Sequence, residues 1–213
     1  ILPSLYLSGD FVGYSVVFDR YLLFYFADVS GHGASSAFVT ILLRFMIGRV
    51  IRKHELEKDC GALARAPEGL IEHLNKQIIG MNLEKHMTLM AGSVDMLNHS
   101  LRYVTAAQLP RPILIKNGNP SFLTGNGKPV GLFQSASWEV HEVEFKKGYT
   151  LVLFSDGVFD LLSERHIVEK ENIILSRLSD CPKNLDDLRK RFFLGDNDCP
   201  QDDVSVLFLK RNM

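Results

Sequence analysis

The sequence predicts an α+β fold in which two sheets are covered by helices, and three observations support this class. Runs rich in apolar residues at 21–27 and 149–155 are too short for core helices and typical of buried strands. Helical periodicity is confined to two groups, one after residue 34 and one after residue 162. The other strand patterns follow one another directly along the chain. Grouped helices and sequential strands favour α+β over an alternating βαβ arrangement.

Strands are expected wherever short apolar or alternating runs are bounded by turn residues. They are predicted at 5–8, 14–18, 21–27, 86–96, 101–107, 112–116, 121–123, 137–145, 149–155 and 204–209. The short polar connections at 19–20 and 97–100 predict hairpins at both places.

Four helices are expected, at about 35–54, 67–80, 164–179 and 185–194, with a polar connection at 55–65. The first helix carries apolar residues on two faces, one with Val39 and Leu43 and the other with Phe38, Ile41 and Phe45. We therefore expect this helix to lie between a sheet and a second helix.

Composition and charge restrict the classes of protein that fit. A chain of 213 residues with 46% apolar content is long enough for one domain with a sizeable core. The net charge of −1 argues against a nucleic-acid partner. No membrane association is expected, because the apolar runs are too short for a transmembrane helix and no signal-peptide pattern opens the chain.

The cysteines and the first residue indicate the cellular context. Cys60, Cys181 and Cys199 lie far apart, which fits a reduced, cytoplasmic protein better than a disulfide scaffold or a zinc site. The chain begins at Ile1 inside a strand-like pattern. We therefore expect the C-terminal part of a longer protein, controlled by an upstream regulatory domain.

Carboxylates recur at the ends of the expected strands. Asp28 closes the apolar run 21–27, Asp156 follows a second such run, and Asp10 follows the strand at 5–8. Asp202 and Asp203 open the last strand. A carboxylate at the end of a buried strand needs a cation or strong donors. Because Mg²⁺ and Mn²⁺ prefer oxygen ligands, the pattern predicts a hard-cation site.

Four motifs carry a resemblance that covers nearly the whole chain. They are Ser-Gly-Asp-Phe at 8–11, Ala-Asp-Val-Ser-Gly-His-Gly at 27–33, Ser-Asp-Gly-Val at 155–158 and Asp-Asp-Val-Ser-Val at 202–206. In this order and spacing they resemble the PPM family of metal-dependent protein phosphatases, in particular its bacterial SpoIIE/RsbU branch.

The resemblance implies one PPM-type domain over residues 1–213, built as a β-sandwich of two antiparallel sheets flanked by helix pairs. It also implies two Mn²⁺ or Mg²⁺ ions at one end of the sandwich. Asp28 would bridge both ions, the backbone carbonyl of Val29 would bind one of them, and Asp10, Asp156 and Asp202 would be further ligands.

The same resemblance implies an activity. Two divalent cations about 3.5–4 Å apart lower the pKa of a shared water toward neutrality. That water would hydrolyse a phosphoserine or phosphothreonine protein, so no side-chain nucleophile is expected. The SpoIIE/RsbU branch implies a small phosphorylated substrate of the anti-anti-sigma type in bacterial signalling.

Two residue assignments stay open. Asp203 is the alternative to Asp202 as a metal ligand. His32 is a candidate general acid beside Asp28, although packing or capping of the turn is the favoured interpretation. The Gly-His-Gly turn at 31–33 is also a candidate phosphate-binding loop, because it precedes a helix.

Two alternative functions also stay open. Gly13 and Gln108 depart from the residues usual in the branch, which leaves room for a pseudo-phosphatase that docks a partner without turnover. A haloacid-type phosphatase with an aspartate nucleophile fits less well, because residues 28–30 read Asp-Val-Ser and lack the second aspartate of that motif.

Overall fold

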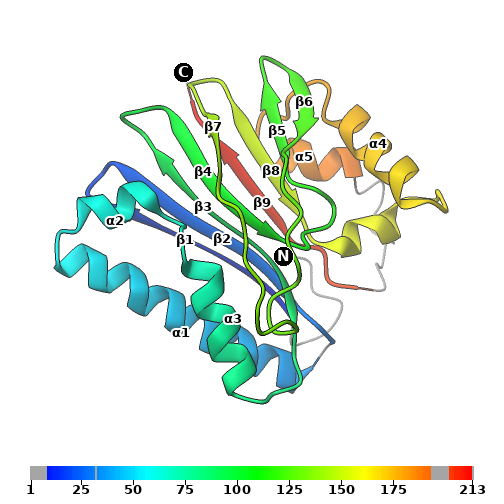
Figure 1. The fold of residues 1–213 in the computed structure, drawn as a ribbon. Coiled ribbons are helices and arrows are strands. Elements are labelled where there is room, and N and C mark those ends of the chain that lie inside the picture. The colour runs from blue at the N-terminus through cyan, green and yellow to red at the C-terminus, as the bar shows by residue number, and fades with distance from the viewer. Residues whose placement is uncertain (1–8, 32, 193–201, 213) are drawn as a thin grey trace. The chain divides into compact units, whose positions relative to one another are not determined.

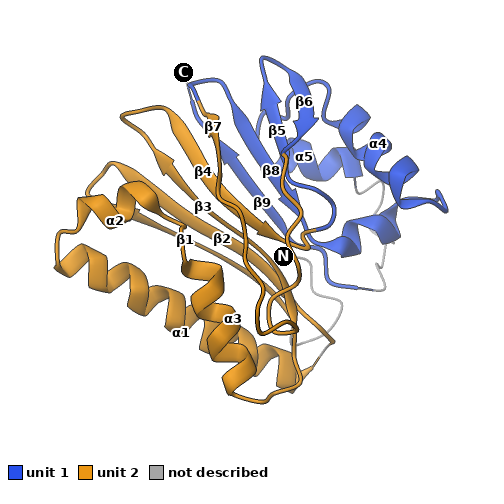
Figure 2. Ribbon diagram, viewed as in Figure 1, with its two compact units in different colours: residues 1–6, 109–123, 146–213 blue, residues 7–108, 124–145 orange. Residues whose placement is uncertain are grey.

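The computed structural model describes residues 9–31, 33–192 and 202–212. These residues form two compact units, coloured separately in Figure 2. The larger unit contains the described residues of 7–108 and 124–145, and the smaller unit those of 109–123 and 146–213. Each unit has its own antiparallel sheet accompanied by helices. The predicted α+β class with two antiparallel sheets is therefore confirmed.

The sheet of the larger unit has the strand order β1-β2-β3-β4-β7. Its strands are β1 (Asp10–Val17), β2 (Tyr21–Val29), β3 (Met87–Asp95), β4 (Ser100–Ala106) and β7 (His141–Glu144). The expected hairpins are present, since β1 pairs with β2 and β3 with β4 in antiparallel register.

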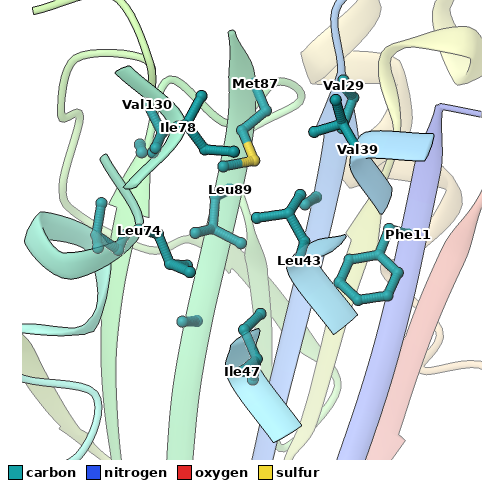
Figure 3. Packing of buried hydrophobic residues seen from close by; sticks show 14 of the residues in the cluster. Phe11, Val29, Val39, Leu43, Ile47, Leu74, Ile78, Met87, Leu89 and Val130 are labelled. Atoms are coloured by element: carbon teal, nitrogen blue, oxygen red, sulfur yellow. The ribbon is translucent and has the colours of Figure 1, made fainter. Parts of the chain in front are cut away.

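Three helices belong to the larger unit: α1 (Ala34–Leu56), α2 (Cys60–Arg65) and α3 (Leu70–Gly80). Figure 1 shows α1 and α3 on one face of its sheet. Val39, Leu43 and Ile47 of α1 and Leu74 of α3 pack there against sheet residues such as Leu89 (Figure 3). Burial of these aliphatic side chains, worth about 1.5–3 kcal/mol each, holds the two helices on the sheet.

The second apolar face of α1 corrects an expectation. Phe38, Ile41 and Phe45 are 55%, 66% and 67% exposed, so no second helix of the described chain covers them. By length and composition α1 is also apolar enough to cross a membrane, which the sequence runs had not suggested. Its opposite face nevertheless packs on the sheet as a core helix does, through Val39 and Leu43.

The sheet of the smaller unit has the order β6-β5-β8-β9. Its strands are β5 (Ile113–Lys116), β6 (Asn119–Phe122), β8 (Thr150–Phe154) and β9 (Val206–Lys210), and its helices are the 3₁₀ helix η1 (Asp156–Leu161), α4 (Ile167–Arg177) and α5 (Leu185–Phe192). Val152 and Phe154 of β8 share a core with Ile174 of α4 and with Leu188 and Phe192 of α5.

Several boundaries differ from the sequence prediction. Residues 60–65 form α2 instead of a polar connection, because Asp59 Oδ1 caps this helix by accepting from the Ala62 N–H at 2.8 Å. The strand expected at 137–145 is reduced to β7, since the Trp138 N–H donates to Glu72 of α3 instead of to a neighbouring strand. The strand expected at 5–8 lies outside the described residues.

Candidate metal centre

The β1–β2 hairpin brings together the first two predicted ligands. Asp10 begins β1 and stands opposite Asp28, the second-last residue of β2. Opposite residues of an antiparallel pair project from the same face, with Cα atoms about 4.5–5.5 Å apart. Asp10 is buried and Asp28 is half-buried. Both carboxylates therefore lie at the same end of this sheet, as the sequence predicted.

A glycine beside these carboxylates permits a close backbone approach. A Cβ atom at Gly9 would lie 2.6 Å from the Val29 carbonyl oxygen and 3.4 Å from Asp28 Oδ1. The Val29 N–H donates to the Gly9 carbonyl at 3.1 Å. Any larger residue at position 9 would displace the carbonyl that the resemblance assigns as a ligand, so the local backbone depends on glycine.

The turn after β2 is held by a lysine that sequence reasoning missed. Lys85 Nζ donates to the Ser30 carbonyl at 2.9 Å and to Ser36 Oγ at 3.2 Å. Ser36 Oγ in turn donates to the same carbonyl at 3.1 Å. A single lysine before a strand carries no sequence pattern. The pairing of Val29 with Met87 is the signal that would have placed Lys85 beside this turn.

The other two predicted ligands lie in the smaller unit, on segments joined by one serine. Ser155 follows β8, and its Oγ donates to the Asp203 carbonyl at 3.0 Å while accepting from the Ser205 N–H at 2.8 Å. The Ser155 N–H donates to the Ser205 carbonyl at 3.0 Å. These bonds fix the start of η1, which carries Asp156, against the segment that carries Asp202.

The carboxylates of Asp156 and Asp202 are near enough to interact electrostatically. Burial raises the pKa of Asp156, and the nearby charges of Asp202 and Asp160 raise it further, against partly compensating bonds from backbone N–H groups. Asp160, also in η1, contacts the second segment directly, because its Oδ2 accepts from the Asp202 N–H at 3.2 Å. The Asp203 N–H donates to Asp202 Oδ1 at 2.8 Å.

The structure thus assembles two pairs, Asp10 with Asp28 and Asp156 with Asp202. Each pair offers hard oxygen donors, which suit Mg²⁺ or Mn²⁺. Burial raises the pKa of Asp156 most and the neighbouring carboxylates raise it further, and a divalent cation would offset both effects. The residues present therefore fit the implied ions. The convergence of both pairs on a shared two-metal site stays a prediction, as does the preference for Asp202 over Asp203.

A tighter group of possible metal ligands lies elsewhere and was not predicted. Ligand atoms of His54, Glu57 and Asp59 lie within 4.8 Å of one another, where α1 ends and α2 begins. Asp59 already has a structural role there, because it caps α2. Of the other residues considered in the sequence, His32 and Cys199 lie outside the described part of the chain.

Comparison with known proteins gives one family. Residues 19–212 match the family model described as stage II sporulation protein E (SpoIIE). Phosphoserine phosphatase RsbP of Bacillus subtilis (strain 168) is 23% identical over 159 residues, covering 72% of this chain and 37% of RsbP. Phosphoserine phosphatase RsbU of the same organism is 24% identical over 176 residues, covering 81% of this chain and 49% of RsbU. The chain spans less than half the length of either relative.

Solved structures agree with this assignment. The SiaA-PP2C domain of Pseudomonas aeruginosa has a TM-score of 0.75 at 20% identity, covering 98% of this chain and 83% of that domain's chain. The PP2C phosphatase domain of SpoIIE from Bacillus subtilis has a TM-score of 0.72 at 16% identity, covering 95% of this chain and 58% of that one. RsbX in complex with magnesium has a TM-score of 0.68 at 15% identity, covering 98% of this chain and 90% of the RsbX chain. At these identities the likeness establishes the fold.

Proposed function

This chain belongs to the SpoIIE family and has the fold of PP2C-type phosphatase domains, and from this premise we propose that it is a metal-dependent phosphoserine/phosphothreonine protein phosphatase. The curated relatives RsbP and RsbU, both named phosphoserine phosphatases, support the reaction class. The magnesium complex of the related RsbX supports a divalent cation as cofactor.

The pairing of Asp10 with Asp28 across β1 and β2 is the observation that carries this proposal. Two carboxylates on one face at a strand end hold negative charge that a divalent cation offsets. Two such ions, when bound, supply Lewis acidity that activates water for attack on phosphorus. Asp10, Asp28, the Val29 carbonyl, Asp156 and Asp202 would hold the ions, so no side chain would have to act as a nucleophile.

The substrate and the cellular setting extend the proposal. The names of RsbP and RsbU support a phosphoserine substrate, and the resemblance to the SpoIIE/RsbU branch favours a small phosphorylated regulator of the anti-anti-sigma type. We place the protein in the cytoplasm, in line with its scattered cysteines. The aligned residues make up 37% of RsbP and 49% of RsbU, which supports the proposal that an upstream domain controls this chain and that the isolated chain has weak metal affinity and low activity.

The test is release of phosphate from a phosphoserine protein after EDTA treatment, followed by a Mn²⁺ titration. We expect metal-dependent turnover that Asp28→Asn and Asp156→Asn each abolish, because each variant removes a charge that offsets the cations. Asp180→Asn is the matched control, since Asp180 is exposed and far along the chain from the predicted ligands. This variant should keep full activity, and so should the protein after alkylation of Cys60.

Four outcomes would contradict parts of the proposal. Full activity of Asp28→Asn, or loss of activity on alkylation of Cys60 without unfolding, would exclude the two-metal mechanism. Binding of the phosphoprotein without phosphate release at any Mn²⁺ concentration, in this chain and in the longer protein alike, would instead favour the pseudo-phosphatase. Equal activity of the isolated chain and the longer protein, with the same metal dependence, would exclude upstream control.

A further inference from the structure

A large groove opens between the helices of the larger unit, on the sheet face that they cover. Its volume is about 1080 Å³. Leu23 and Tyr25 of β2 and Ala91 of β3 line it together with residues of α1, α2 and α3. Figure 1 shows α2 near the C-terminal end of α1, with α3 running back toward the N-terminal half of α1. The groove therefore has one end near α2 and another near the end of α3.

The two ends of this groove differ in chemistry. At the end near the close of α3 the lining is apolar and includes Leu42, Phe45 and Met46 of α1 and Met81, which follows α3. Phe45 is 67% exposed and Met81 is 37% exposed, so this apolar lining is accessible. Exposed aromatic and thioether side chains that face a groove favour an apolar occupant.

The end near α2 is cationic. Arg49 and Lys53 of α1 and Arg65 of α2 line it, and all three are exposed. Glu68 is the one acidic residue among those that line the groove, which leaves an excess of two positive charges with the histidines neutral. The N-terminus of α3 also lines this end and has no side-chain cap at Gly69. Its uncapped N–H groups add partial positive charge.

We propose that this groove binds a long-chain carboxylate, with the alkyl tail along Leu42 and Met46 and the carboxylate at Arg49, Lys53 and Arg65. An amphipathic acidic helix fits less well, because its acids would recur along its whole length while the cations gather at one end. A second copy of this chain would bring the same cations together. The segment of α1 from Leu42 to Lys53 is about 16 Å long, which suits a single extended alkyl chain.

The binding test uses palmitate, at concentrations where light scattering detects no aggregates, added to the intact chain in a calorimeter. We expect one site per chain. The affinity should fall about fourfold for each methylene removed from the tail, and the methyl ester of palmitate should bind at least tenfold more weakly because it lacks the charge. This inference does not depend on phosphatase activity, so failure of one leaves the other standing.

Matched variants locate the site. The double variant Arg49→Gln/Lys53→Gln should weaken palmitate binding at least tenfold, whereas Arg52→Gln, an exposed neighbour that does not line the groove, should not. Phe45→Ser should also weaken binding about tenfold, while Phe38→Ser, also exposed on α1 but outside the groove, should leave it unchanged. All five substituted side chains are exposed, so the variants should keep the fold.

Several results would overturn the proposal. They are equal affinity for palmitate and its methyl ester, binding only where aggregates form, equal losses in the control variants, or no binding at all. Sedimentation provides a further check, since a dimer that Phe45→Ser dissociates would assign this surface to a second copy of the chain. Tighter binding of an acidic amphipathic peptide that competes with palmitate would assign it to a protein partner.

Discussion

Replacing Gly157 by alanine should force apart the two segments that carry Asp156 and Asp202. An alanine Cβ at this position would lie 2.2 Å from the Asp203 carbonyl oxygen and 3.3 Å from the Asp202 carbonyl carbon. Real Cβ contacts essentially never fall below 3.0 Å. Because the clashing atoms belong to the backbone, no side-chain rotation relieves the clash. The two segments must therefore move apart by at least about 0.8 Å, which requires a shift of the backbone.

The size of the effect follows from the bonds that cross this contact. Overpacking of this kind costs about 1–3 kcal/mol. The two hydrogen bonds of Ser155 Oγ, to the Asp203 carbonyl and from the Ser205 N–H, span the same gap, and weakening them adds about 1 kcal/mol. Gly157→Ala should therefore lose about 2–4 kcal/mol of unfolding free energy. Metal ligands tolerate misplacement of about 0.5 Å, so Mn²⁺ affinity should fall at least tenfold.

Urea unfolding in EDTA measures the first quantity and a Mn²⁺ titration the second. Gly48→Ala is the matched control, because Gly48 lies inside α1 with nothing within 4 Å of the added Cβ. Alanine there should stabilise the protein by up to about 1 kcal/mol through its higher helix propensity. Equal unfolding free energies for the two variants, with unchanged Mn²⁺ affinity in Gly157→Ala, would refute the reasoning.

Three further predictions concern contacts that hold the sheets and turns. The Arg20 guanidinium lowers the pKa of buried Asp95. This pair therefore stabilises the protein above about pH 4, and that stability is lost as pH falls through the lowered pKa of Asp95. Asp95→Asn should remove this part of the acid dependence of stability, as measured by urea unfolding at different pH values. Lys85→Met should lose about 1–2 kcal/mol through its bonds to the turn after β2, while exposed Lys76→Met should lose nothing measurable. Arg111→Met should cost about 3 kcal/mol, because it removes the cation that pairs with the buried carboxylate of Glu171 on α4. The double variant Arg111→Met/Glu171→Gln should recover most of the loss.

The elements predicted well from the sequence are those whose conformation is determined by a few neighbouring residues. The run 21–27 became β2 because its apolar side chains leave few alternatives to a buried strand. A short polar connection such as 19–20 indicates a hairpin, but the register that places Asp10 opposite Asp28 depends on the three-residue connection 18–20 that the structure shows. The pairing of Asp156 with Asp202 was harder, since it depends on β8 meeting β9 from distant parts of the chain.

The features that sequence reasoning missed depend on tertiary contacts, which a local sequence pattern does not record. The two apolar faces of α1 were predicted to be covered alike, yet only the face with Val39 and Leu43 meets the sheet. Periodicity records that a face is apolar and carries no information on what covers it. Phe45 was therefore assigned to a core, although it lies exposed beside a groove. An apolar residue that the described fold leaves exposed beside a groove is a candidate for binding, as Phe45 is for the alkyl tail of the proposed long-chain carboxylate.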